Sequence, residues 1–195
     1  MQCVRRCNFI CGAVLSILLL LCSCQAGAGP LIPPDNFPSK NAFLGKEMLL
    51  AALNQEYFDQ VSSPNHFIHG IDSAAETVFL YLEQNSGGDI NKAVKSLTEN
   101  PEDGYGRVNC ADAVLRRISP LPSETYWVSY SFLSADMLED GVLKENAAVG
   151  PIAQNLIDHR MLLTVYSPSG SGYEKAGFAV GVIGGQALVV AVFVS

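Results

Sequence analysis

Cysteine is nearly absent from the part of the chain that should fold. Five of the six cysteines lie at or before position 24, and only Cys110 follows them. A disulfide framework within one mature chain is therefore excluded. The HExxH, CxxC and GxSxG motifs and the phosphate-binding loop are also missing. Three histidines occur, His66, His69 and His159, and we expect surface or capping roles for the first two. These scarcities favour a protein without a metal site or a bound cofactor.

Basic side chains are the second scarcity. Twelve lysines and arginines stand against nineteen aspartates and glutamates, a formal net charge of −7 at pH 7. Nucleic-acid binding relies on clustered positive charge, so we expect no nucleic-acid partner. Apolar residues make up 49% of the chain and charged residues 16%, which excludes a disordered chain and a coiled coil. A length of 195 residues suits one domain with a tail.

The N-terminus has no hydrophobic run of membrane-spanning length. Arg5 and Arg6 precede an uncharged apolar stretch at 12–21, which is half of the roughly 20 residues that cross a bilayer. A stretch of this length is typical of a signal peptide. We therefore expect residues 1–23 to be a signal peptide and the protein to be exported. Its removal leaves ten basic side chains against nineteen acidic ones, a formal charge of −9.

This segment ends in Leu21-Cys22-Ser23-Cys24, which resembles the lipobox of bacterial lipoproteins. The resemblance implies that Cys24 is acylated and anchors the protein to a membrane, at the periplasmic face or at the cell surface. Two or more acyl chains make such an anchor stable. The alternative is an ordinary secretory signal that is cleaved near Ala26 or Ala28.

The remaining chain divides into a tether and a domain. Residues 24–45 begin with the cysteine to be lipidated and are rich in glycine, proline and alanine without hydrophobic periodicity, which predicts a flexible tether. One globular domain is expected at 46–195. Its expected helices are 46–60, one that starts at a Ser73–Glu76 capping box, one behind the cap Asp89, one behind the cap Asn109, 134–140 and 151–159. Its expected strands are 126–132, 161–166, 176–183 and 186–194, with a turn at Gly184-Gly185.

The last two strands are apolar at nearly every position, so both faces of their sheet should be covered. We therefore predict an α/β (α+β) fold in which helices pack on both faces of a small antiparallel sheet. This α-β-α sandwich should have a helical first half and a three-stranded C-terminal end.

Five short segments occur in a familiar order: 49–57, Glu145-Asn146, 159–163, 177–181 and Val192-Phe193. They resemble the first helix, the Gly-Glu-Asn motif, the His-Arg-x-x-Leu segment and the final strands of the CAP superfamily, the cysteine-rich secretory protein fold. The resemblance implies a ligand-binding cavity with Glu145 and His159. The family's cavity usually holds two histidines and two acids, and only these two residues carry over. We therefore expect a degenerate cavity that binds a ligand without holding zinc.

Cys110 supports an alternative hypothesis. It lies at the start of an expected helix, where oriented backbone N–H groups favour a thiolate. His159 before a strand and Glu174 after it would complete a Cys-His-Glu arrangement. This order resembles transglutaminase-like and NlpC-type cysteine hydrolases, which implies Cys110 as nucleophile and His159 as base. The competing interpretation is a structural cysteine on a core helix.

Three functional hypotheses follow from the sequence. The first is a lipid-anchored envelope protein whose CAP-like domain binds an apolar or cell-envelope ligand, such as a lipid or a cell-wall component, or a partner protein, without catalysis. The second is a cysteine hydrolase that acts on peptidoglycan or peptides. The third is a structural envelope protein without pocket chemistry. We favour the first hypothesis.

Overall fold

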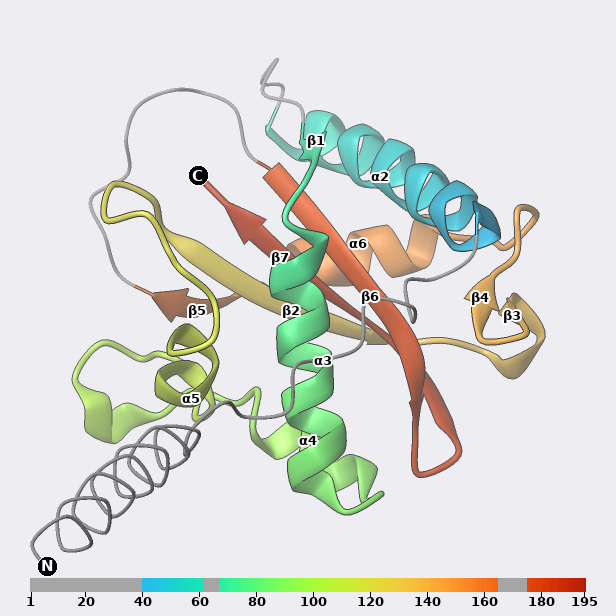
Figure 1. Cartoon of the computed structure of the whole chain (residues 1–195). Helices are drawn as coiled ribbons and strands as arrows, with labels where there is room; N and C mark the ends of the chain where they lie inside the picture. The colour runs from blue at the N-terminus through green and yellow to red at the C-terminus, as the bar shows by residue number, and fades with distance from the viewer. Residues whose placement is uncertain (1–39, 62–66, 165–174) are drawn as a thin grey trace, which may run out of the picture. The chain divides into compact units, whose positions relative to one another are not determined.

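The computed structural model describes residues 40–61, 67–164 and 175–195 (Figure 1). These residues belong to one compact unit, Pro38–Ser195. The α-helices are α2 (Lys40–Val61), α3 (Asp72–Ser86), α4 (Ile90–Lys95), α5 (Ala111–Leu115) and α6 (Gly150–Asp158). The strands are β1 (Ile68–His69), β2 (Tyr126–Phe132), β3 (Leu138–Glu139), β4 (Val142–Leu143), β5 (Met161–Thr164), β6 (Lys175–Ile183) and β7 (Gln186–Val194). Two short 3-10 helices occupy Pro101–Asp103 and Ala135–Met137.

Five strands form the main sheet in the order β1-β6-β7-β2-β5. The pairs β6–β7, β7–β2 and β2–β5 are antiparallel, as expected. The edge strand β1 runs parallel to β6, so the sheet is mixed and the expectation of a purely antiparallel sheet is wrong. β5 also pairs with β2 and not with the last two strands. The sequence pattern missed β1 because it has only two residues.

Each face of the sheet carries its own hydrophobic core, which confirms the predicted layered α/β fold. Alternate residues of β7 supply both cores, since successive side chains of a strand point to opposite faces. Val190 and Val192 pack in the core that includes residues of α3, α4 and α5. Val189, Ala191 and Phe193 pack in the core that includes residues of α2 and α6. Figure 1 shows α3 in front of the sheet and α6 behind it.

The β6–β7 hairpin matches the sequence prediction closely. Gly184 and Gly185 form its two-residue turn with φ angles of 59° and 79°. Positive φ at both positions defines the turn type that suits the right-handed twist of paired strands. The Gly184 turn also lies so close to the Gly88 carbonyl oxygen that a Cβ atom there would collide with it.

Of the predicted helix starts, that of α4 is confirmed and those of α2 and α3 are wrong in detail. α2 begins at Lys40 and not near residue 46. The side chain of Asp89 caps α4 as predicted, because it accepts hydrogen bonds from the Asn91 and Lys92 amides. No Ser73 capping box forms, because α3 already begins at Asp72.

The predicted cap of α5 and the predicted helix at 134–140 are also corrected. Asn109 donates its side-chain N–H groups to the Lys95 carbonyl and the Thr98 hydroxyl, so it links the start of α5 to the end of α4 and the turn after it, and it does not cap α5. Residues 135–143 form a 3-10 turn and the β3–β4 hairpin, which reverses at Asp140-Gly141 with φ angles of 51° and 78°. An Asp-Gly pair is a strong signal for such a turn.

Candidate functional site

Cys110 lies in the hydrophobic core and is 1% exposed. It precedes α5, a helix of only five residues, and its backbone N–H donates to the Ser96 carbonyl. Burial raises the pKa of the Cys110 thiol to about 12, and a backbone hydrogen bond at the same residue only partly opposes this effect. Burial therefore disfavours the thiolate, the form in which a cysteine attacks a substrate. These properties are those of a structural cysteine and not of a nucleophile.

His159 and Glu174 were the expected partners of Cys110. His159 lies exposed at the end of α6, where its Nδ1–H donates to the Asn155 carbonyl at 3.0 Å. Glu174 and the lipidation candidate Cys24 both lie outside the described residues. Cys110 belongs to the hydrophobic core that includes residues of α3, α4 and α5, whereas His159 is exposed.

The β3–β4 hairpin and the residues after it line a hollow of about 850 Å³. Glu145, which the sequence resemblance assigned to a binding cavity, is one of the residues that line this hollow. His159 is not among the described residues of its wall. The lining residues are Glu139, Asp140, Val142, Leu143, Lys144, Glu145 and Asn146. The structure therefore places one of the two predicted ligand-binding residues at a concave surface.

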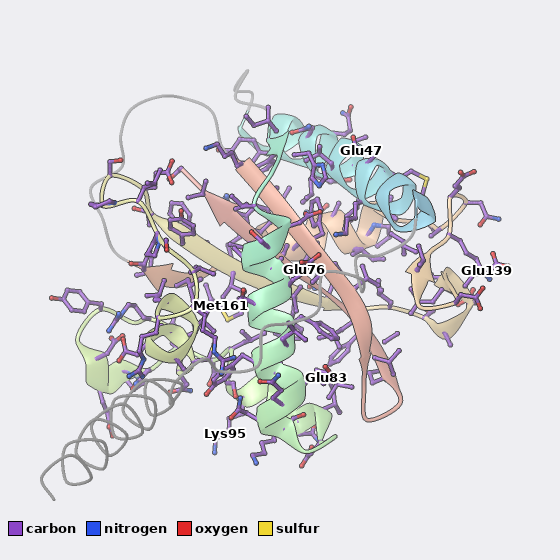
Figure 2. The ribbon with its side chains drawn as sticks, in the orientation of Figure 1. Glu47, Glu76, Glu83, Lys95, Glu139 and Met161 are labelled. Atoms are coloured by element: carbon purple, nitrogen blue, oxygen red, sulfur yellow. The ribbon has the colours of Figure 1, made fainter. Side chains whose placement is uncertain are left out.

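Uncompensated negative charge characterises this hollow. Glu139, Asp140 and Glu145 are exposed, and none forms an ion pair or side-chain hydrogen bond in the described part of the chain. The neighbouring cation, Lys144, donates its Nζ to the Asp136 carbonyl at 2.7 Å. The walls thus offer three carboxylates with free acceptor oxygens, which attract cationic groups. Figure 2 labels Glu139 on the hairpin.

A second polar cluster, centred on Asp72, was missed by the sequence analysis. The Lys46 Nζ from α2 lies 2.8 Å from Asp72 Oδ2, and the His69 Nε2 lies 3.1 Å from the same oxygen. The His69 Nδ1 in turn lies 3.2 Å from Glu47 Oε1. Lys46 also approaches Glu76 Oε1 at 3.8 Å. Figure 2 shows Glu47 on α2 and Glu76 on α3.

This Asp72 cluster ties four elements together. The other Asp72 oxygen, Oδ1, accepts a hydrogen bond from the Phe178 amide of β6 at 2.8 Å. Ile71 precedes it with a φ of 56°, a left-handed conformation that β-branched residues rarely adopt. A Cβ atom on Gly177 would collide with the Ile71 carbonyl, so the chain is tightly packed at this crossing. We interpret the cluster as structural, because each oxygen of Asp72 already binds within the protein.

The described residues contain no group of three or more histidine, cysteine, aspartate and glutamate side chains that could hold a metal ion. Within the same part of the chain, no helix is both long enough and apolar enough to cross a bilayer. Comparisons with protein-family models, curated proteins and solved structures found no match for this chain.

Proposed function

We propose that this protein is a lipid-anchored protein of the bacterial envelope whose α/β domain binds a ligand or a partner protein without catalysing a reaction. In this proposal Cys24 carries the lipid and residues 25–39 separate the domain from the membrane. The hollow beside the β3–β4 hairpin is the binding site. The membership in the CAP superfamily that the sequence suggested remains a prediction.

The hollow with Glu145 is the observation that carries the binding part of the proposal. The hollow is a concave surface with three carboxylates in its wall, and none of them forms an ion pair with a cation of the described chain. Four of its seven lining residues are charged, which favours a ligand with positively charged groups over a purely apolar one. Amine-bearing cell-wall components and basic protein segments both have this chemistry.

The geometry of Cys110 argues against the hydrolase alternative. A cysteine hydrolase needs a thiolate that the substrate can reach, and the Cys110 thiol is 1% exposed with a pKa raised by burial to about 12. The described residues offer no other thiol. A binding role agrees better with these properties than a hydrolytic one.

Lipidation can be tested with two cysteines that lie two positions apart. The full chain is expressed in a bacterial host, and detergent partitioning and mass spectrometry are used to detect acyl chains. We expect Cys24→Ala to abolish acylation and to leave the precursor uncleaved, while the matched variant Cys22→Ala is processed normally. Acylation of the Cys24→Ala variant would contradict the anchor assignment.

Ligand binding in the hollow can be tested with a cationic probe. The purified full chain in detergent is titrated with a labelled lysine trimer, and its affinity is compared with that of a glutamate trimer. We expect the double variant Glu139→Gln/Glu145→Gln to weaken binding of the lysine probe about tenfold at low salt, with the loss shrinking as salt increases. The control Glu83→Gln changes an exposed acid of α3. Equal losses in the two variants would contradict a role for the hollow.

A further inference from the structure

The outer edge of β6 is largely unpaired. β6 pairs with β7 along all nine of its residues, from Lys175↔Val194 to Ile183↔Gln186. On its other side it pairs with β1 only at Lys175 and Ala176. On its outer side, the part of β6 from Gly177 to Ile183 therefore has no hydrogen-bonded strand among the described residues.

The hairpin register shows which backbone groups point outward. Ile183 and Gln186 flank a two-residue turn, so Ile183 directs its N–H and C=O groups toward β7. Even-numbered residues of β6 consequently direct theirs away from β7. Two observations agree with this parity, since the Ala176 carbonyl accepts from the Gly70 amide and the Phe178 amide donates to Asp72. Both are contacts on the outer side.

Val180 and Val182 continue this outward series, and within the described chain their outward N–H and C=O groups have no hydrogen-bond partner. The Val182 residue is 48% exposed. Natural sheet edges are usually protected by charged residues, prolines or bulges. Residues 176–183 of β6 contain no charged residue and no proline, and their pairing with β7 is continuous.

The negatively charged hollow lies on this same side. β4 contacts β6, and Figure 1 shows the β3–β4 hairpin on the side of β6 opposite to β7. A chain that added to Val180 and Val182 would therefore run on the side of β6 that faces the β3–β4 hairpin. The N–H and C=O groups specify an extended polypeptide, because only a strand presents complementary groups at the same spacing. The three carboxylates specify a basic residue next to it.

We propose that the outer edge of β6 at Val180 and Val182 binds an extended, basic segment of a partner protein by β-strand addition, with its positive charge beside the β3–β4 hollow. This inference rests on the proposed binding function and names the class of partner. A second copy of this chain fits less well. Because α3 packs over β6, the α3 of the second copy would pack over its own β6 in the neighbouring strand position. Packed helices need about 8–10 Å between their axes, whereas adjacent strands are about 4.8 Å apart.

A proline substitution on the outer edge tests the backbone contact. Val182→Pro removes an outward N–H group without removing a hydrogen bond to β7, which a strand edge tolerates. Val182→Thr is the matched control because it keeps the N–H group. The probe is a peptide of about eight residues with alternating valine and threonine and two terminal lysines, and its counterpart ends in two glutamates. Binding is measured by fluorescence anisotropy on the full chain in detergent.

We expect the lysine peptide to bind the parent chain and Val182→Thr equally, and Val182→Pro about tenfold more weakly. Hydrogen exchange should slow at Val180 and Val182 when the peptide binds. Binding that Val182→Pro leaves unchanged but Glu145→Gln weakens would overturn strand addition and leave the hollow as the site. Dimerisation of the free chain that Val182→Pro abolishes would overturn it in favour of a second copy. Failure of the peptide to bind, with lysine-trimer binding intact, would also overturn it without affecting the proposed function.

Discussion

The two hairpins of this domain have the same kind of two-residue turn but differ in strand length and in burial. Gly184-Gly185 and Asp140-Gly141 both reverse the chain in two residues with positive φ angles. The first turn joins two strands of nine residues, and the second joins two strands of two residues. β7 buries eight of its nine residues, whereas Glu139 and Asp140 of the short hairpin are exposed.

This comparison shows that the turn reverses the chain, whereas burial sets the length and stability of the strands. A two-residue turn with positive φ angles reverses the chain in either setting, but strand length and stability depend on the apolar area that the strands bury. The buried hairpin contributes to both cores of the domain. The short hairpin buries Leu143 in one core but keeps Glu139 and Asp140 exposed, which leaves these charged side chains available for binding.

The largest difference in stability between the two hairpins is expected when an apolar side chain of each is shortened to alanine. Phe193 of β7 is fully buried, and we expect Phe193→Ala to lower the free energy of unfolding by about 4 kcal/mol. Val142→Ala in the short hairpin should cost less than about 1.5 kcal/mol, because Val142 is only half-buried. Urea denaturation measures both changes. Similar losses in the two variants would contradict the difference in burial.

The two turns provide a second, smaller contrast. Gly184 and Gly141 both have positive φ angles, but a Cβ atom would collide with the Gly88 carbonyl only at Gly184. We expect Gly141→Ala to cost about 1 kcal/mol from backbone strain alone. Gly184→Ala should cost about 3 kcal/mol because the collision adds to that strain. Thermal unfolding of the two variants checks the order, and a larger loss for Gly141→Ala would refute it.

The loop at 103–107 differs from both hairpins, because hydrogen bonds to one carboxylate hold its backbone and burial of apolar side chains does not. Asp103 accepts hydrogen bonds from the amides of Tyr105, Gly106 and Arg107 and from the Arg107 Nε. Desolvation raises the pKa of Asp103, but these hydrogen bonds and the charge of Arg107 outweigh it, so the pKa lies below the usual value of 3.8.

The lowered pKa of Asp103 sets the sign of its pH dependence. The ionised carboxylate stabilises the folded state above the unfolded-state pKa, and this stabilisation is lost as the pH falls through the folded-state pKa. We expect Asp103→Asn to be less stable than the parent at pH 7, with the difference shrinking toward pH 3. Denaturant unfolding at both pH values measures this effect, which should be the smallest of the three. A difference that grew on acidification would contradict the assignment.

Much of the fold could be predicted from local patterns. The predicted bounds of β2 and β7 match those of the structure, and the Gly184-Gly185 turn and the Asp89 cap are present as predicted. These features depend on alternation, apolar runs and residues with strong turn or cap preferences, all of which act within a few positions. The segment 134–140 was misassigned because its residues carry a weak helical pattern that ends at Gly141, where the Asp140-Gly141 signal for a turn was overlooked.

The candidate site was less accessible to sequence reasoning. Glu145 was selected from the family resemblance and lines the hollow in the structure, while its role in ligand binding remains a prediction. Glu139 and Asp140 were not selected, because a short acidic stretch by itself indicates only a solvated loop. Cys110 was selected as the nucleophile of the alternative hypothesis, and no sequence pattern indicated the burial of its side chain that the structure shows. Two partners of Asp72, Lys46 and Phe178, are 26 and 106 residues away from it, so no local pattern could join them to the cluster.

The amino-acid sequence by itself determined the layered α/β fold, its central hairpin and an N-terminal segment that predicts export and lipidation. These follow from hydrophobic periodicity, turn residues and segment length, which are properties of neighbouring residues. The tertiary structure alone decided the parallel pairing of β1, the burial of the Cys110 thiol, the Asp72 cluster and the unpaired edge of β6 beside an acidic hollow. Each of these depends on contacts between distant segments, whose positions are set by how the two cores pack and not by any local preference.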